Sequence, residues 1–211
     1  MVTQIASKYG WTSSGAEPAH SYLVPATVQL LKKFSIASML DIGTGNGSSL
    51  PAWQSQVECV AAMEPDEEGF NYARQYEGTD VRQLGVGHAV PEEWKNKFDC
   101  IVSLEVIEHL YNPLEMVKTC QQALKAGGIV IISTPYHGYV KNLAMAVFDL
   151  WDFHHDPIRT GGHIKFWTRR SLSDLFRKGG FKELHFQGVG RAPYIWKSMI
   201  MVFQAEKNIR I

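Results

Sequence analysis

Short apolar runs alternate with helical patterns along residues 38–133, and this alternation constrains the fold more than any other feature of the sequence. Strands are expected over 38–42, 57–63, 80–83, 98–104 and 129–133, and helices over 26–34, 46–53, 66–76 and 112–125. Strands that alternate with helices are typical of a mostly parallel sheet with helices on both faces. The run 129–133 is almost entirely β-branched, as expected of a buried parallel strand.

The pattern changes after Pro135. Residues 136–165 are rich in aromatic residues and histidine and are expected to form a lid, with helical spacing over 139–153. One more helix is expected over 168–179, followed by two strands over 181–188 and 198–206. The sequence therefore predicts a single α/β domain over 1–211, doubly wound, with a mostly parallel seven-stranded sheet and an antiparallel C-terminal edge hairpin. Residues 1–35 are expected to form an N-terminal cap.

Composition narrows the classes of partner. The chain of 211 residues has 21 Lys and Arg against 21 Asp and Glu. Nucleic acid is not expected as a partner, because proteins that bind it usually present a basic face. Cys59, Cys100 and Cys120 form no C-x-x-C pair and are expected to be buried free thiols. No secretory signal and no apolar run of about 18 residues is recognised, so a cytoplasmic protein is expected.

A glycine-rich loop follows the first expected strand. It has the pattern G-x-G-x-G at Gly43, Gly45 and Gly47, with Asp41 before it and Glu64 at the end of the next strand. Glycines allow a sharp turn and a close approach of a ligand, and the carboxylate of Glu64 could accept both hydroxyl groups of a ribose. The negative charge of Asp41 would repel a pyrophosphate but suits a sulfonium and an ammonium group. The alternatives are a plain structural turn or a site for a different nucleotide.

The segments LDIGTGNGS, Glu64-Pro65-Asp66 and FDCIVSLEVIEHL resemble, in order and spacing, the motifs of class I S-adenosylmethionine-dependent methyltransferases, which have a Rossmann-like fold. The resemblance implies S-adenosyl-L-methionine as cofactor. It implies the methionine moiety beside the loop, the ribose on Glu64 and the adenine near Met63 and Asp66. The cofactor residues expected are Asp41, Gly43, Thr44, Gly45, Gly47, Glu64, Pro65, Asp66 and Leu104. The sequence departs from the family at Gly85, where many members have an acid that contacts the adenine. N-terminal aromatic segments often cover the cofactor in this family, which suggests that role for Trp11, His20 and Tyr22.

A possible metal site follows the fourth expected strand. If residues 105–110 turn helically, Glu105, Glu108 and His109 share one face. Such a set suits Mg²⁺, Mn²⁺ or a similar divalent cation. The alternative is that the glutamate caps backbone amides and the histidine packs under the cofactor, without metal.

His163 precedes Trp-Thr-Arg in a segment that is similar to one supplying a metal histidine in the small-RNA 2′-O-methyltransferases. The ubiquinone-biosynthesis O-methyltransferases share the E-x-x-E-H pattern and are linked to Mg²⁺. The resemblance thus implies Glu105, Glu108, His109 and His163 as metal ligands. His109 and His163 are the catalytic candidates, with His154 and His155 as further possible bases. His137 and His185 are expected to be ordinary solvated or hydrogen-bonded histidines.

Residues 133–181 are most similar to the ubiquinone-type O-methyltransferases. We therefore expect methyl transfer to a hydroxyl group of a small aromatic or quinone-like acceptor. Two alternatives stay open: an RNA-terminal 2′-O-methyltransferase, and a non-catalytic module that binds S-adenosylmethionine. The apolar segment 139–153 is expected to cover the active site, or to make a weak peripheral contact with a membrane.

Overall fold

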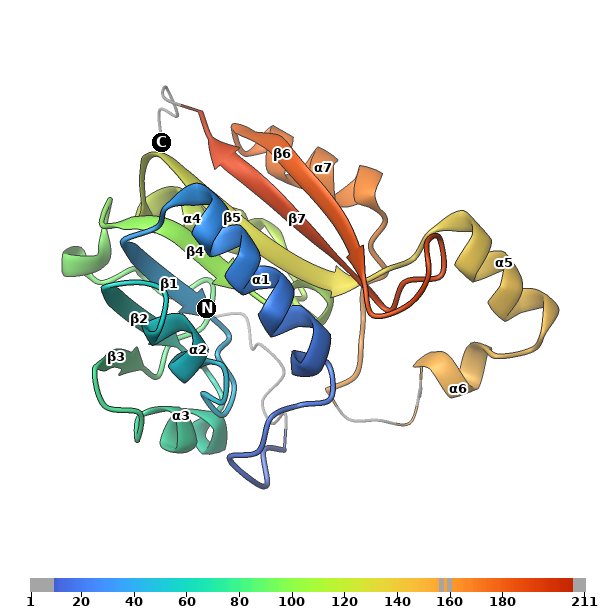
Figure 1. The fold of residues 1–211 in the computed structure, drawn as a ribbon, viewed down its shortest axis with the longest axis horizontal. Coiled ribbons are helices and arrows are strands. Elements are labelled where there is room, and N and C mark those ends of the chain that lie inside the picture. The colour runs from blue at the N-terminus through green and yellow to red at the C-terminus, as the bar shows by residue number, and fades with distance from the viewer. Residues whose placement is uncertain (1–9, 156–157, 159–160, 207–211) are drawn as a thin grey trace.

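One sheet organises the molecule. The computed structural model describes residues 10–155, 158 and 161–206 (Figure 1). Within them a seven-stranded sheet has the order β3-β2-β1-β4-β5-β7-β6. Strands β1 to β5 are parallel, whereas β7 is antiparallel to both β5 and β6. The bounds are β1 (Ser38–Ile42), β2 (Cys59–Met63), β3 (Thr79–Arg82), β4 (Phe98–Ser103), β5 (Leu124–Pro135), β6 (Phe181–Val189) and β7 (Ser198–Ala205). The predicted mostly parallel sheet with an antiparallel edge hairpin is confirmed.

Helices cover both faces of this sheet (Figure 1). Their bounds are α1 (His20–Phe34), α2 (Leu50–Gln54), α3 (Glu67–Ala73), α4 (Leu114–Ala123), α5 (Tyr139–Val147), α6 (Trp151–His155) and α7 (Arg169–Lys178), with short 3₁₀ turns at Glu92–Trp94 and Ile107–His109. Side chains alternate along each strand, so β1 contributes to two cores. Met39 packs in the cluster that includes α1 and α2, whereas Leu40 and Ile42 pack in the cluster that includes α4 and α7.

Polar side chains define where two of the helices begin. The Oδ1 atom of Asp66 accepts a hydrogen bond from the backbone N–H of Gly69 at 2.9 Å and caps α3. Thr168 and Ser171 form a reciprocal capping box at the start of α7. Each side chain satisfies an N–H group that has no partner within its helix.

The lid differs from the prediction of a single covering helix. It contains two helices, α5 and α6, which project beyond the end of β5 (Figure 1). Asp149 has a left-handed backbone with φ 51°, which interrupts the helical path between them. The apolar residues at helical spacing, Leu143, Val147, Leu150 and Trp151, are exposed, which the covering alternative did not predict and the surface-contact alternative allows. Met145 and Lys141 are instead the buried side chains of α5.

Three further details depart from the sequence analysis. Helix α1 begins at His20, six residues before the expected start, and Pro25 lies inside it. Helix α4 ends at Ala123, two residues before the expected end, and strand β5 begins at Leu124 and runs through Gly127 and Gly128. Cys59 was expected to be buried but is exposed at the start of β2, whereas Cys100 and Cys120 are buried. In the part of the chain that the structure describes, no helix is both long and apolar enough to cross a bilayer.

Candidate functional site

The glycine loop turns between β1 and α2 with a backbone that side chains would strain. Gly43, Gly45 and Gly47 have φ of 75°, 59° and 77°, in the region that favours glycine. A Cβ atom on Gly47 would lie 2.8 Å from the Cα atom of Ala73, and one on Gly45 would lie 2.4 Å from Cζ2 of Trp11. The glycines are therefore required both by the turn and by neighbours that approach it closely.

Glu64 lies directly after β2 and is held by two backbone amides. Its Oε2 atom accepts from the N–H of Gly45 at 2.8 Å, and its Oε1 atom accepts from the N–H of Asp66 at 2.9 Å. The side chain is buried, and burial raises its pKa to about 7 although both hydrogen bonds oppose the rise. Each oxygen keeps capacity for a further donor, which is the arrangement needed to accept two vicinal hydroxyl groups.

Asp41 stabilises the glycine loop through hydrogen bonds to its buried carboxylate. Its Oδ2 atom accepts hydrogen bonds from the indole of Trp53 at 2.9 Å and from the hydroxyl of Thr44 at 3.0 Å, with Ser49 at 3.4 Å. Burial raises the pKa of Asp41 to about 6. The structure therefore gives Asp41 the role of a buried support that joins the loop, through Thr44, to Trp53 of α2. The sequence analysis did not identify Trp53 as its partner, because no motif links the two.

A cavity of about 390 Å³ opens beside the loop, within the range typical of small-molecule sites. The predicted residues that line it are Trp11, His20, Tyr22, Gly43, Thr44, Gly45, Glu64, Pro65, Asp66, Leu104, Glu105, His109 and His163. Asp41, Gly47 and Glu108 were predicted for the site but do not line this cavity. The sequence analysis missed six lining residues: Glu17, Pro18, Ala19, Val106, Leu110 and Lys197. Val106 and Leu110 lie within the segment FDCIVSLEVIEHL, although the sequence analysis did not single them out. Glu17, Pro18, Ala19 and Lys197 lie outside the quoted motifs, and tertiary packing places them here.

The N-terminal segment forms one wall of the cavity. Asn46, within the glycine loop, donates through Nδ2 to the carbonyl oxygens of Ser13 and Gly15 at 2.9 and 2.7 Å. Nδ1 of His20 lies 3.1 Å from the hydroxyl of Ser48. The segment held by these contacts includes Trp11, whose indole packs against Gly45. Trp11 therefore lies at the position where a ligand would approach the glycines.

Glu105 departs from the expected helical face. Its backbone has φ 55°, and the turn that follows is a 3₁₀ helix over Ile107–His109. The two carboxylate oxygens accept from the hydroxyls of Ser133 at 2.7 Å and Ser198 at 3.1 Å. Burial raises the pKa of Glu105 to about 7, while these hydroxyls and Lys141 oppose the rise. The expectation that Glu105 shares one face with Glu108 and His109 is wrong, because a left-handed residue precedes the turn.

Glu108, His109 and His163 come together. One ligand atom from each lies within 4.8 Å of the others, and Nε2 of His163 is 4.0 Å from Oε1 of Glu108. The backbone explains why His163 arrives here: the carbonyl of Glu108 accepts from the N–H groups of Ile164 and Lys165, each at 3.0 Å. Nδ1 of His109 lies 3.2 Å from the carbonyl of Gly162, which only accepts. This contact places the proton of a neutral His109 on Nδ1 and the lone pair on Nε2.

Burial of the Glu108 carboxylate carries a large desolvation cost. The side chain is fully buried, and neither oxygen has a hydrogen bond of good geometry among the described residues. Burial, and next the neighbouring charge of Glu105, raise the pKa of Glu108 well above its ordinary value. The hydroxyl of Thr134 and the backbone N–H of Glu108 lie near enough only to oppose part of the rise in this pKa. A buried carboxylate of this kind is stable only when protonated or when paired with a cation. The residues present therefore fit a cation bound between Glu108 and the two imidazoles.

Comparison with known proteins gives the family. A model described as a methyltransferase domain matches residues 17–185. The ubiquinone biosynthesis O-methyltransferase of Cereibacter sphaeroides (strain ATCC 17029 / ATH 2.4.9) is 35% identical over 171 residues, 75% of this chain. The chain covers 65% of that relative's own length. The enzyme of the same name from Ruegeria sp. (strain TM1040) is 31% identical over 173 residues, covering 78% of this chain and 68% of the relative.

Solved structures share the fold. A SAM-dependent methyltransferase from Aquifex aeolicus superimposes with a TM-score of 0.65 at 16% identity, covering 89% of this chain and 93% of that one. The seven-stranded sheet, the glycine loop after β1 and the acid after β2 agree with this likeness. From the family model, the relatives and the fold together, the chain belongs to the methyltransferase-domain family.

Proposed function

We propose that the chain transfers a methyl group from S-adenosyl-L-methionine to a hydroxyl group of a small aromatic or quinone-like acceptor. One observation supports this most: a single cavity is lined both by the glycine loop with Glu64 and by His109 with His163. The glycine loop and Glu64 suit the cofactor, and the two histidines can accept a proton from the acceptor hydroxyl. A reaction that joins a cofactor to a hydroxyl group needs both within one enclosed space.

The cofactor half of the proposal assigns each residue a task. Glu64 accepts the ribose hydroxyls on the oxygens that Gly45 and Asp66 already orient. The positive φ of Gly43 and Gly45 lets backbone atoms approach the methionine part. Asp41, buried beneath the loop, supplies a negative field for the sulfonium. Trp11, which packs directly on Gly45 and Gly69, would cover the cofactor on that side.

The acceptor half needs a group that removes the hydroxyl proton as the new carbon–oxygen bond forms. His109 is suited to this, because its Nε2 lone pair is fixed by the contact of Nδ1 with the carbonyl of Gly162. Alternatively, a divalent cation would be held by Glu108, His109 and His163, since the buried carboxylate fits it; His109 would then give its Nε2 lone pair to the ion and would not act as the base. Such an ion lowers the pKa of a hydroxyl bound to it. Glu105 then positions the cavity wall through Ser133 and Ser198 rather than acting as a ligand.

The choice of acceptor rests on the relatives and on the lid. Both relatives named above are ubiquinone biosynthesis O-methyltransferases. Helix α5 and the residues after it expose large apolar side chains, among them Tyr139, Val147 and Phe148. Such a surface suits a polyprenyl tail or a weak contact with a membrane. Sedimentation with phospholipid vesicles tests the contact, and Val147→Asp with Phe148→Asp should abolish it.

The experiment combines calorimetry with turnover. We expect the wild-type protein to bind S-adenosylmethionine and to methylate a catechol, with the product identified by mass spectrometry. Glu64→Ala should lose cofactor binding, whereas His109→Ala should keep it and lower kcat by about 100-fold or more. His185→Ala, on β6, is the matched control. A folded wild-type protein that binds no S-adenosylmethionine would overturn the proposal.

Metal is tested separately by titrating Mg²⁺ or Mn²⁺ into protein treated with a chelator. Binding that His163→Ala and Glu108→Gln both remove supports the cation and narrows the acceptors to those with adjacent oxygens. If turnover is independent of added metal and of chelator, His109 acts as the base without a cation.

A further inference from the structure

Three histidines meet at the base of the lid. His137 follows the end of β5 by two residues, and His154 and His155 are the last two residues of α6. The ring centroids of His137 and His155 are 5.5 Å apart, and those of His154 and His155 are 4.9 Å apart. One ring nitrogen from each of the three lies within 4.8 Å of the other two. None of the three lines the cavity that contains Glu64 and His109.

Aromatic packing alone does not account for this cluster. Phe166 contacts the rings of His137 and His155, at 5.2 and 4.7 Å between centroids, and Trp151 lies 4.2 Å from His155. These ring contacts are edge-on or tilted and supply no hydrogen bond to the nitrogens. His137 has the side chain of Asn142 as a polar neighbour, which opposes part of the fall in its pKa. Both nitrogens of His155 are buried and have no hydrogen-bond partner among the residues that the structure describes. An imidazole so placed loses its bonds to water without replacement, which is costly unless another ligand is bound.

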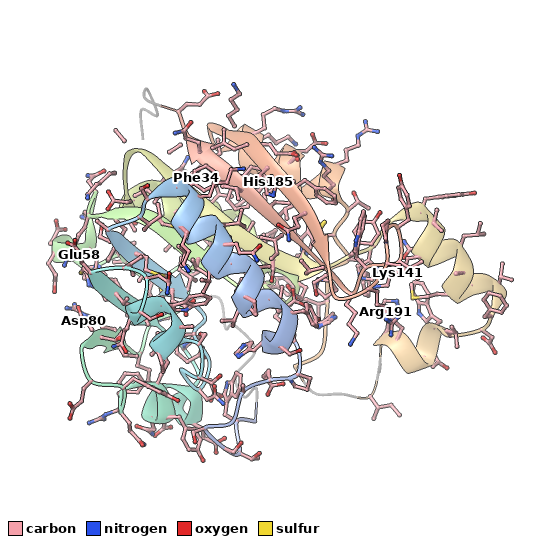
Figure 2. All side chains as sticks on the ribbon, in the orientation of Figure 1. Phe34, Glu58, Asp80, Lys141, His185 and Arg191 are labelled. Carbon is pink, nitrogen blue, oxygen red and sulfur yellow. The ribbon has the colours of Figure 1, made fainter. Side chains whose placement is uncertain are left out.

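The histidines are in the form that binds metals. Burial, and next the charge of Lys141, lower the pKa of His137 and of His154 to about 4 each. Neutral imidazoles at neutral pH need no proton released before they bind an ion. Lys141 and Arg191 lie near each other beside α6 (Figure 2), and burial and Arg191 lower the pKa of Lys141 to about 8. The positive side chains of Lys141 and Arg191 lower the affinity of the three histidines for a metal ion, but they favour an anion as the fourth ligand of that ion.

We propose that His137, His154 and His155 form a binding site for a transition-metal ion, with Zn²⁺ as the ion best suited, that fixes α6 to the end of β5. Three imidazoles with an open fourth position are a known ligand set for zinc. Zn–N bonds of about 2.0–2.1 Å in tetrahedral geometry bring the nitrogens to about 3.3 Å from one another. Side-chain rotation must therefore close the present spacing. This site is separate from the oxygen-containing set at Glu108 and does not depend on the proposed reaction.

The test uses protein without a histidine tag, treated with a chelator, in a His109→Ala background that disables the other candidate site. Calorimetric titration with Zn²⁺ should show one equivalent bound. His155→Gln or His137→Gln should weaken the Kd by about 100-fold or more, since even residues behind the ligands can change affinity by 10–100-fold. His185→Gln, with the same exchange on β6, should bind Zn²⁺ as the parent does. Zn²⁺ should also raise the Tm of the parent and leave that of His155→Gln unchanged.

Folding of each variant is checked by S-adenosylhomocysteine binding and circular dichroism without metal. If His155→Gln does not fold, His154→Gln, whose ring is partly exposed, gives the same comparison. Unchanged Zn²⁺ affinity in the folded triad variants overturns the proposal. So does a His109→Ala parent that binds no Zn²⁺.

Discussion

Glu64 should make cofactor binding depend on pH near neutrality. The side chain is buried and burial raises its pKa to about 7, against an ordinary value of 4.5. A ribose donates two hydrogen bonds, so it binds best to the ionised carboxylate. If only that form binds, the competent fraction falls from about ten elevenths at pH 8 to about one eleventh at pH 6. The Kd should then be roughly tenfold weaker at pH 6 than at pH 8.

The same pKa acts on folding in the opposite sense. Because the folded-state pKa of Glu64 is raised, its contribution to stability is fully present below pH 4.5 and is lost as the pH rises through 7. The difference between about 7 and 4.5 corresponds to about 3 kcal/mol in the ligand-free protein. Cofactor binding should therefore stabilise the protein most at pH 8, where the ionised carboxylate most needs donors.

The assay is calorimetric titration with S-adenosylhomocysteine at pH 6, 7 and 8. This ligand lacks the sulfonium charge, so ionisation of Asp41, whose pKa is about 6, affects it less. Glu64→Gln turns an amide NH₂ toward the N–H of Gly45 or Asp66 and leaves one donor unpaired. Its binding free energy should be less favourable by about 1–3 kcal/mol, which raises the Kd roughly 5–150-fold. The Kd should also no longer vary with pH. Glu68→Gln, an exposed change nearby, is the control.

Two results would refute this reasoning: a wild-type Kd that is flat from pH 6 to 8, or a Glu64→Gln variant that keeps the same pH slope. The first would mean that Glu64 is already ionised or makes no contact. The second would assign the titration to another group.

The remaining predictions concern stability. Gly47→Ala should cost about 1–3 kcal/mol, read as a lower Tm, because φ is 77° and the new Cβ meets the backbone of Ala73 at 2.8 Å; an unchanged Tm would contradict the strain. Trp53→Phe should cost about 1–3 kcal/mol in urea unfolding at pH 8, because it removes the indole donor from buried Asp41, and the cost should shrink below pH 6, where Asp41 is protonated. Thr168→Ala should cost about 1 kcal/mol by loss of the α7 cap, with Thr168→Ser as the control that retains it.

Local patterns were sufficient for the sheet and for the meeting of the glycine loop with Glu64. Strand β1 lies where its apolar run predicts, and β2, β3 and β4 lie within two residues of prediction at each end. Gly43, Gly45 and Glu64 meet because consecutive parallel strands end at the same edge, so a fixed spacing in sequence becomes a fixed position in space. The bounds of α1 and α2 were predicted less well, because helix ends depend on packing as much as on propensity.

Long-range packing decided the rest. His163 reaches Glu108 through two backbone hydrogen bonds that join segments more than fifty residues apart, and only the resemblance to other enzymes suggested that meeting. The left-handed backbone of Glu105 directs its side chain toward Ser133 and Ser198, which the predicted helical turn over 105–110 does not allow. The sequence predicts an ordinary solvated or hydrogen-bonded histidine at 137, because the two histidines that approach it lie on a helix 17 and 18 residues further along the chain.

The sequence by itself thus determined the order of strands and helices, the turn of the glycine loop and the position of the acid after β2. Each depends on residues near one another in the chain, where side-chain period and backbone sterics act directly. Only the tertiary structure decided which carboxylates and imidazoles converge, which loop covers the cavity and which face of the lid is exposed. Those outcomes depend on how distant segments pack, and no local spacing encodes them.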